Sequence, residues 1–151
     1  MGKEENATLK RIQEVAIKEF LEKGFKGASL RDIVKKAGVT TGAFYGYYSS
    51  KEALFEDLVS ETADYMYEKF CGMQEKFEKL SVEEQTRQME EYSIDYLDDV
   101  VDYAYEHKGI FRLILQSSAG TKYENYIHQM VEIEIRSTEE YVARMRKEGY
   151  D

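Results

Sequence analysis

The stretch VTTGAFYGYYSSKEAL, residues 39–54, brings together hydroxyl groups, rings, small residues and an ammonium group. Thr40, Thr41, Tyr45 and Tyr47 offer hydroxyls that can donate hydrogen bonds to phosphate oxygens. Gly42 and Ala43 carry little or no side chain, so a backbone at these positions can come close to another molecule. Lys51 adds a cation at the start of the next expected helix, where free amide groups already favour an anion.

Helical spacing divides the aromatic residues of this stretch between two faces. Phe44 and Tyr48 are four residues apart, and so are Thr41 and Tyr45. Residues four apart share one face of a helix. We therefore expect Phe44 and Tyr48 to point inward onto the first helix of the chain, while Thr41 and Tyr45 point outward together.

The preceding residues predict two helices that would position this face. Apolar residues at helical spacing predict a first helix over residues 8–23, with Gly24 as its left-handed stop. A short second helix follows an N-cap at Ser29 and ends at Gly38. The third helix, of about two turns, begins at either Thr40 or Thr41, and this order is that of a helix-turn-helix.

In a helix-turn-helix the second short helix enters the major groove of DNA. The charge distribution fits this arrangement. Residues 1–50 hold nine basic and six acidic residues, net +3, whereas residues 51–151 carry net −12, and the whole chain carries −9. A mildly basic amino-terminal part on an acidic body is typical of a DNA-binding domain joined to a domain with another function.

Residues 9–55 resemble the DNA-binding domain of the TetR family of bacterial transcriptional regulators. The matching elements are Ala16, Phe20, Gly24-Phe25, Ser29-Leu30-Arg31-Asp32-Ile33, Ala37-Gly38-Val39, Gly42, Phe44-Tyr45, Tyr47-Tyr48 and Ser50-Lys51-Glu52-Ala53-Leu54. The resemblance implies base contacts from the start of the third helix and phosphate contacts from Tyr45, Tyr47 and Lys51. It also implies a role for Arg31 at the edge of the groove.

Two positions depart from the family pattern. Gly46 stands where relatives often have a larger residue, and Tyr47 stands where they often have histidine. Glycine costs a helix roughly 1 kcal/mol against alanine. We therefore predict that this helix becomes better ordered when DNA binds.

The remainder of the sequence predicts further helices, so the fold class is all-α. A fourth helix opens at Ser49 or Ser50 and runs to about Phe70 as a connector, and a capping box at Ser81 opens a long helix to about Tyr105. Gly109 is expected to stop that helix, and a short apolar helix covers 110–116. A last helix begins at Thr121, with Ile127, Val131, Glu134, Thr138, Tyr141 and Met145 on its buried face.

We expect a helix-turn-helix DNA-binding domain over residues 1–50 and a helical domain over 51–151. The family resemblance implies that the second domain binds a small-molecule effector and forms a homodimer through its last two helices. Relatives usually continue with two more helices, so we expect this chain to be truncated at Asp151. The implied protein is a transcriptional regulator, most often a repressor, that binds a near-palindromic operator on double-stranded DNA and is released by its effector.

Tyrosines are abundant in the acidic body, and they suggest how an effector could be held. The candidate ligand-binding residues are Tyr92, Tyr96, Tyr103, Tyr123, Tyr126 and Glu134. Ring faces together with a buried carboxylate would suit a flat organic cation. This hypothesis concerns the class of effector only.

Other functional classes have weaker support in the sequence. One alternative is a helical small-molecule-binding or interaction protein with a non-functional DNA head. A metal-dependent enzyme is another, but His107 and His128 read better as a helix cap and a surface residue. No nucleophile–base constellation is present, Cys71 is the sole cysteine, and no cofactor motif is found. We expect no enzyme activity, no bound metal and no membrane span, and a cytoplasmic location.

Overall fold

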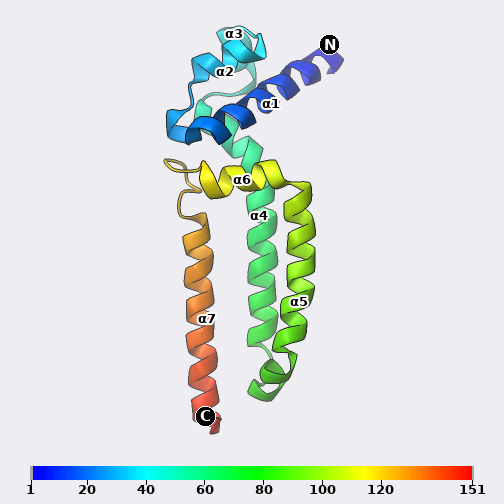
Figure 1. Ribbon diagram of the computed structural model, residues 1–151, viewed down its shortest axis with the longest axis vertical. Helices are drawn as coiled ribbons and strands as arrows, with labels where there is room; N and C mark the ends of the chain where they lie inside the picture. The colour runs from blue at the N-terminus through cyan, green and yellow to red at the C-terminus, as the bar shows by residue number, and fades with distance from the viewer. Residues whose placement is uncertain (1, 151) are drawn as a thin grey trace. The chain divides into compact units, whose positions relative to one another are not determined.

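The computed structural model describes the backbone of residues 2–150 and the side chains of residues 7–88 and 98–150. Over these residues the chain forms helices and no strands, so the predicted all-α class is confirmed (Figure 1). The helices are α1 (Gly2–Gly27), α2 (Leu30–Ala37), α3 (Thr41–Tyr47), α4 (Lys51–Glu78), α5 (Val82–Glu106), α6 (Lys108–Gln116) and α7 (Tyr126–Glu148).

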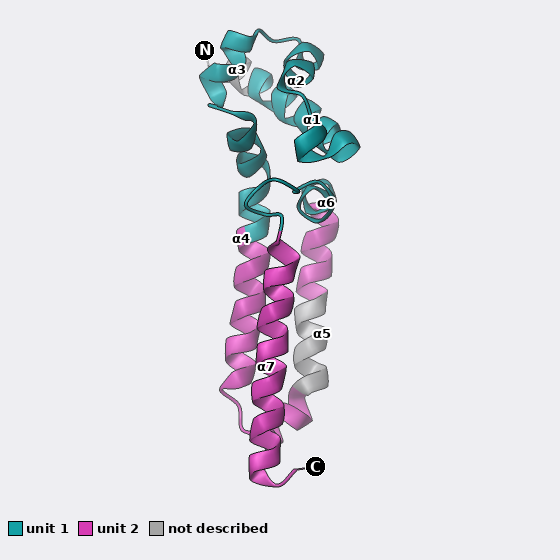
Figure 2. Ribbon diagram, turned by 90° about the vertical axis from the view of Figure 1, so that its left-hand side faces the viewer, with its two compact units in different colours: residues 1–63, 108–124 teal, residues 64–107, 125–151 magenta. Residues whose placement is uncertain are grey.

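The chain divides into two compact units (Figure 2). The first unit contains residues 1–63 and 108–124, and the second contains residues 64–107 and 125–151. The amino-terminal half of α4 belongs to the first unit and its remainder to the second. The predicted boundary at residue 50 concerns DNA binding and effector binding, and it stays a prediction.

Side-chain caps fix where the helices of the first unit begin. The Ser29 hydroxyl accepts from the Asp32 amide at 3.3 Å, as predicted. The Thr40 hydroxyl accepts from the Ala43 amide at 3.0 Å, and the Ser50 hydroxyl accepts from the Ala53 amide at 3.0 Å. Thr40 and Ser50 are therefore the caps that the sequence left undecided.

Two glycines with positive φ shape the path from α1 to α3. Gly38 caps α2 in the left-handed conformation, with φ 67° and ψ 33°, as predicted. Gly24 has φ 71° and ψ 169°, and it breaks α1 without ending it, since helical backbone resumes up to Gly27. The prediction of a helix end at Gly24 located the break but missed this last short piece.

Apolar side chains from all four amino-terminal helices meet in the core of the first unit. Its fully buried members include Ile12, Phe20, Ile33, Phe44, Leu54 and Phe55. Three rings are in mutual contact, with centroids 5.9 Å apart for Phe20 and Phe25, 5.1 Å for Phe20 and Phe55, and 5.3 Å for Phe25 and Phe55. This cluster joins the end of α1 to the start of α4.

The second unit consists of the rest of α4, with α5 and α7 running alongside it in both views (Figures 1 and 2). The predicted capping box is present, because the Ser81 and Glu84 side chains each accept from the other's backbone amide. Arg144 of α7 donates to the Glu78 carbonyl at 3.1 Å and to the Gln85 side chain at 3.1 Å. These bonds attach α7 to the turn between α4 and α5.

Several predicted helix ends in the carboxy-terminal part were wrong. α4 continues to Glu78, eight residues beyond the expected end, because Gly72 lies inside the helix without positive φ and the next N-cap signal is Ser81. The predicted end of α5 near Tyr105 and the capping role of His107 are confirmed, since α5 ends at Glu106 with His107 as its C-cap. The expected stop at Gly109 was wrong, because α6 begins at Lys108 and Gly109 lies inside it. α7 begins at Tyr126, since the residues from Thr121 form turns stabilised by their own side chains.

The predicted buried face of α7 was also wrong. Ile127 and Val131 are 44% and 46% exposed, and Glu134 is exposed as well, whereas Tyr126 and Ser137 are buried. Apolar and polar residues alternate around this helix, so the hydrophobic periodicity of the sequence did not single out one face. Which face is buried depends on the helices that pack against it. Among the helices of the described chain, none is both long and apolar enough to cross a membrane.

Candidate nucleic-acid interface

The outer face of α3 is exposed and uncharged. Thr40, Thr41, Gly42 and Ala43 are all exposed, and Tyr45 is 54% exposed. The Tyr45 ring lies edge-on to the buried ring of Phe44, with the centroids 5.6 Å apart. Two threonine side chains, the small residues Gly42 and Ala43 and the supported ring of Tyr45 are therefore exposed together, as the sequence predicted for this face.

The inner face of α3 is anchored by Phe44 and Tyr48, which confirms their predicted orientation. Phe44 is fully buried, and Tyr48 is 8% exposed. The Tyr48 hydroxyl donates to Asp57 at 2.6 Å and accepts from the Gln13 amide at 3.0 Å. Burial, reinforced by the Asp57 carboxylate, raises the pKa of Tyr48 to about 12. The end of α3 is thus bonded to α1 and α4.

Two further predicted DNA contacts lie on either side of this face. Arg31 is exposed in the first turn of α2, and Tyr47 is half-buried in the last turn of α3. Tyr47 is therefore less available than Tyr45 in this conformation. The predicted contacts of both residues with DNA stay predictions.

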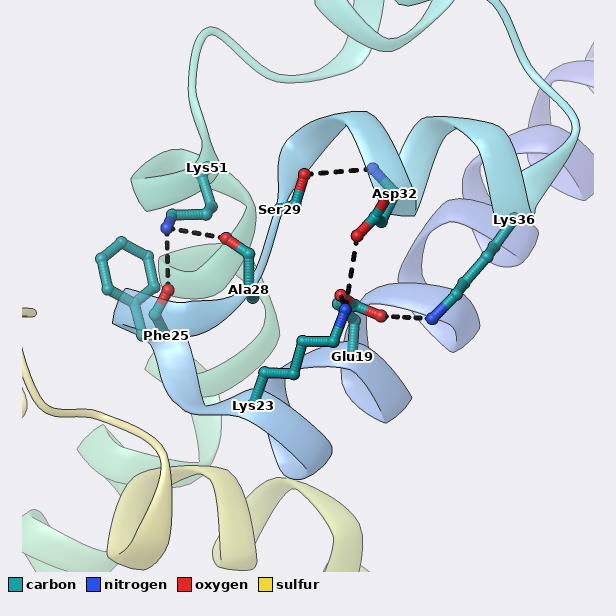
Figure 3. A network of polar contacts seen from close by, with 8 residues as sticks. All are labelled: Glu19, Lys23, Phe25, Ala28, Ser29, Asp32, Lys36 and Lys51. Carbon is teal, nitrogen blue, oxygen red and sulfur yellow. Dashed lines mark hydrogen bonds and ion pairs between the residues drawn. The ribbon is translucent and has the colours of Figure 1, made fainter.

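A buried carboxylate, which the sequence analysis did not single out, joins α1 to α2 (Figure 3). Glu19 is 1% exposed, and its two oxygens lie 2.6 Å from the ammonium groups of Lys23 and Lys36. Lys23 also lies 3.3 Å from Asp32. Hydrogen bonds from Lys23 and Lys36 lower the pKa of Glu19 against the opposing effect of burial. The i, i+4 spacing of Glu19 and Lys23 was visible in the sequence, whereas Lys36 joins only through the fold.

Lys51 occupies a different environment from the one the sequence suggested. Its ammonium group donates to the Phe25 carbonyl at 2.8 Å and to the Ala28 carbonyl at 3.1 Å (Figure 3). It also lies over the Phe25 ring, 4.4 Å from the centroid. Lys51 therefore binds the turn between α1 and α2, and its predicted contact with a DNA phosphate stays a prediction.

The candidate effector-binding residues do not gather at one place in the described structure. The side chains of Tyr92 and Tyr96 lie outside the described residues. Tyr123 is buried in the first unit, beside Phe55, with ring centroids 6.4 Å apart. Tyr103, Tyr126 and Glu134 belong to the second unit. Glu134 accepts a hydrogen bond from the buried Gln74, and its exposure overturns the expectation of a buried carboxylate.

The second unit contains a column of stacked rings that the sequence did not reveal. The Tyr65 and Tyr103 rings are 3.9 Å apart and nearly parallel, and His107 stacks on Tyr103 at 4.1 Å. Lys69 lies over Tyr65, 5.8 Å from its centroid, and is paired with Asp99 at 2.7 Å. Tyr65 and Tyr103 come from different helices, so only the fold brings them together. Among the described residues, no group of three potential metal ligands is found.

Comparison with known proteins identifies relatives of the amino-terminal segment. Residues 12–58 match the family described as bacterial regulatory proteins, tetR family. The uncharacterized HTH-type transcriptional regulator YvdT of Bacillus subtilis is 44% identical over 68 residues, which are 42% of this chain and 35% of YvdT. The aligned part of the chain thus spans about a third of that relative's length.

Two longer matches extend beyond this segment. The probable HTH-type transcriptional regulator YttP of Bacillus subtilis is 28% identical over 149 residues, which cover 91% of this chain and 69% of YttP. A crystal structure of a transcriptional regulator of the TerR/AcrR family from Aquifex aeolicus matches with a TM-score of 0.50 and 26% identity. That match covers 89% of this chain and 71% of the Aquifex chain.

Proposed function

Because this chain belongs to the TetR family of bacterial transcriptional regulators, we propose that it is a repressor that binds a near-palindromic operator as a homodimer. The observation that carries this proposal is the face of α3. Thr40, Thr41, Gly42, Ala43 and Tyr45 are exposed there without any formal charge, while Phe44 holds the helix from behind. Such a surface suits close approach to base edges, with hydroxyls available for phosphates.

Arg31 and Tyr47 would extend the contact to the edges of the groove. Two copies of α3 would meet successive major-groove faces about 34 Å apart. The repressor KstR2 of Mycolicibacterium smegmatis is 28% identical over 59 residues, which supports the choice of repression over activation. The DNA-binding role is assigned to the first 50 residues, and the effector and dimer roles to residues 51–151.

DNA binding is tested by fluorescence anisotropy with the DNA upstream of the protein's own gene, over a salt series. Specific binding that falls steeply with salt is expected. Tyr45→Ala should weaken it, whereas Tyr105→Ala, which removes an even more exposed tyrosine from α5, should not. If that DNA binds no better than random sequence, a genomic selection should recover another operator. If neither the upstream DNA nor a genomic selection yields a specific DNA site, the alternative of a helical binding protein with a non-functional DNA head is supported.

We further propose that the second unit takes up a small-molecule effector that releases DNA. The stacked rings of Tyr65, Tyr103 and His107 favour a planar aromatic compound as the effector. Tyr92, Tyr96 and Tyr126 remain candidate contacts for it. The exposed Glu134 is a weaker partner for a cation than the buried carboxylate that the sequence suggested. A thermal-shift panel of planar cations and planar neutral compounds tests the proposal, and no shift with any cation would reject that class.

A further inference from the structure

The exposed side chains at the start of α3 end in methyl and hydroxyl groups. Thr41 and Ala43 lie in the first turn of the helix, on either side of Gly42, and all three residues are exposed. Apart from its neighbours in the chain, a Cβ added at Gly42 would meet only the Thr40 Oγ1 atom, at 3.9 Å. The space in front of this turn is therefore open, and the methyl groups of Thr41 and Ala43 face it from both sides of Gly42.

Contacts at both ends of α3 fix the position of this turn. The Thr40 hydroxyl accepts from the Ala43 amide at 3.0 Å, which closes the first turn, and the next residue, Phe44, is fully buried. At the other end of the helix, the Tyr48 hydroxyl donates to Asp57 of α4 at 2.6 Å. A helix held at both ends presents its methyl groups at fixed positions, as selective recognition requires.

The side chains that most often distinguish bases are missing from α3 and its flanking residues. In the major groove, arginine and lysine read guanine, asparagine and glutamine read adenine, and acidic side chains read cytosine. Residues 39–50 contain none of these residue types. The polar side chains of this segment carry only hydroxyls, which can donate or accept and so suit more than one base. Hydrogen bonds from these side chains would therefore discriminate poorly between bases.

Methyl groups provide the remaining means of discrimination. Thymine carries a methyl group on C5 in the major groove, and the methyl groups of alanine and threonine make apolar contacts with it. Thr41 and Ala43 each present a methyl group, and Gly42 places no side chain between them. A thymine methyl group can therefore lie directly against the first turn of α3.

We propose that α3 reads its half-site through thymine methyl groups, with Thr41 and Ala43 as the specificity-determining residues. The operator would then carry an A·T or T·A pair where the first turn of α3 enters the major groove. The inference rests on the proposed DNA-binding function. It adds the class of base that each half-site must contain and the chemical group by which that base is recognised.

In-vitro selection of the full chain on random double-stranded DNA supplies the operator for the test. If no sequence is enriched, the proposed DNA-binding function is rejected, and the inference about α3 is rejected with it. If an operator is enriched, each of its thymines is replaced by uracil in turn, which removes the methyl group and keeps the base pair. The outcome of this replacement then concerns the inference alone.

We expect uracil to weaken binding about fourfold at one or more thymines of each half-site, and more than tenfold when both half-sites are changed. At such a position, 5-methylcytosine paired with guanine should bind more tightly than unmethylated cytosine, because it restores the methyl group. Fluorescence anisotropy measures each affinity. Equal affinity of all the uracil operators for the protein would overturn the proposal, and so would equal binding of the two cytosine operators.

Matched variants identify the protein group that makes the contact, through the ratio of affinities for the thymine and uracil operators. Thr41→Ser and Ala43→Gly each remove a methyl group from the protein, so this ratio should be smaller than in the wild type. Thr41→Val keeps a methyl group and removes the hydroxyl, so the ratio should not change. Thr138→Ser, at an exposed position of α7, is the control and should also leave it unchanged.

Comparing two DNAs with the same variant cancels any effect of the substitution on protein stability. A wild-type ratio in both Thr41→Ser and Ala43→Gly would show that neither methyl group contacts thymine, and the proposal would be wrong. A smaller ratio in Thr41→Val than in Thr41→Ser would identify the hydroxyl as the reading group and would also overturn it.

Discussion

At the scale of single residues, the pKa values of Tyr48 and Glu19 in the first unit are shifted in opposite directions and for different reasons. The pKa of Tyr48 is raised mainly by burial. The pKa of Glu19 is lowered because its hydrogen bonds to two ammonium groups outweigh the effect of its burial. Neither side chain is a predicted DNA contact. Both hold the helices to which the DNA contacts are assigned in the proposal, so their titration should affect the stability of the first unit.

Tyr48→Phe should destabilise the protein by about 1 kcal/mol at neutral pH, since the hydroxyl bonds to Asp57 and Gln13 are lost. The folded pKa of Tyr48 is raised, so its contribution to stability is complete below pH 10 and is lost as the pH rises toward 12. Urea unfolding of both proteins from pH 8 to 12 should therefore show a difference that shrinks above pH 10. A difference that stays constant to pH 12 would contradict this account.

Glu19→Gln should destabilise the protein at neutral pH, because Lys23 and Lys36 lose their shared anion. The folded pKa of Glu19 is lowered, so its contribution is complete above the ordinary value of 4.5 and is lost as the pH falls through the lowered pKa. Thermal melts at pH 7, 5, 4 and 3 should show the two proteins converging in acid. Glu22→Gln, at an exposed position of the same helix, serves as the control and should have little effect at any pH.

At the scale of elements, the short helices α2 and α3 depend on their ends. Each has a hydroxyl N-cap, and α2 ends in a left-handed glycine. These end signals lie within four residues of the helix whose ends they define, which explains why they were predicted from the sequence.

Two glycine-to-alanine changes in these elements should have opposite effects. Gly38→Ala places a side chain at φ 67°, so we expect a loss of about 1 kcal/mol or more in the free energy of unfolding, although nothing lies within 4 Å of the new methyl group. Gly46 lies inside α3 without positive φ, and an added Cβ there also meets nothing within 4 Å. Gly46→Ala should therefore stabilise the protein by roughly 1 kcal/mol. Equal shifts in melting temperature for the two variants would contradict this reasoning.

The helical geometry of α3 also bears on the prediction that it becomes better ordered on DNA. The helix spans Thr41–Tyr47 in the protein alone, so any change on binding concerns its stability rather than its existence. Hydrogen exchange of residues 40–48 with and without operator measures this change. Equal protection in both states would refute the prediction, and Gly46→Ala should reduce the difference.

Sequence reasoning succeeded where the signal is local and failed where it depends on distant neighbours. The inward orientation of Phe44 and Tyr48 followed from helical spacing alone. The hydrogen bonds from Lys51 to the Phe25 and Ala28 carbonyls join residues more than twenty positions apart, and they form only once the turn between α1 and α2 has folded. The buried face of α7 was mistaken because its apolar residues lie on more than one side, and only packing decides which of them are covered.

At the scale of the whole molecule, the proposed homodimer predicts a dependence on operator geometry. Half-sites one helical turn apart present the same face of DNA to both copies of α3. Inserting five base pairs between the half-sites should abolish high-affinity binding by placing them on opposite faces, and inserting ten should restore part of it. Electrophoretic mobility shifts with the three operators measure this. Equal affinity for all three would mean that the copies bind independently.

The absence of formal charge from α3, Thr41–Tyr47, has a consequence for the kinetics of target search. Attraction to random DNA comes from cations meeting phosphates, so it must arise from lysines and arginines on other elements of the head. Under the proposed function, those residues would set how long the protein stays on random DNA, while α3 would set the sequence at which it stops. Substitutions in α3 should therefore redirect the regulator to new sequences and leave its affinity for random DNA and its rate of sliding unchanged.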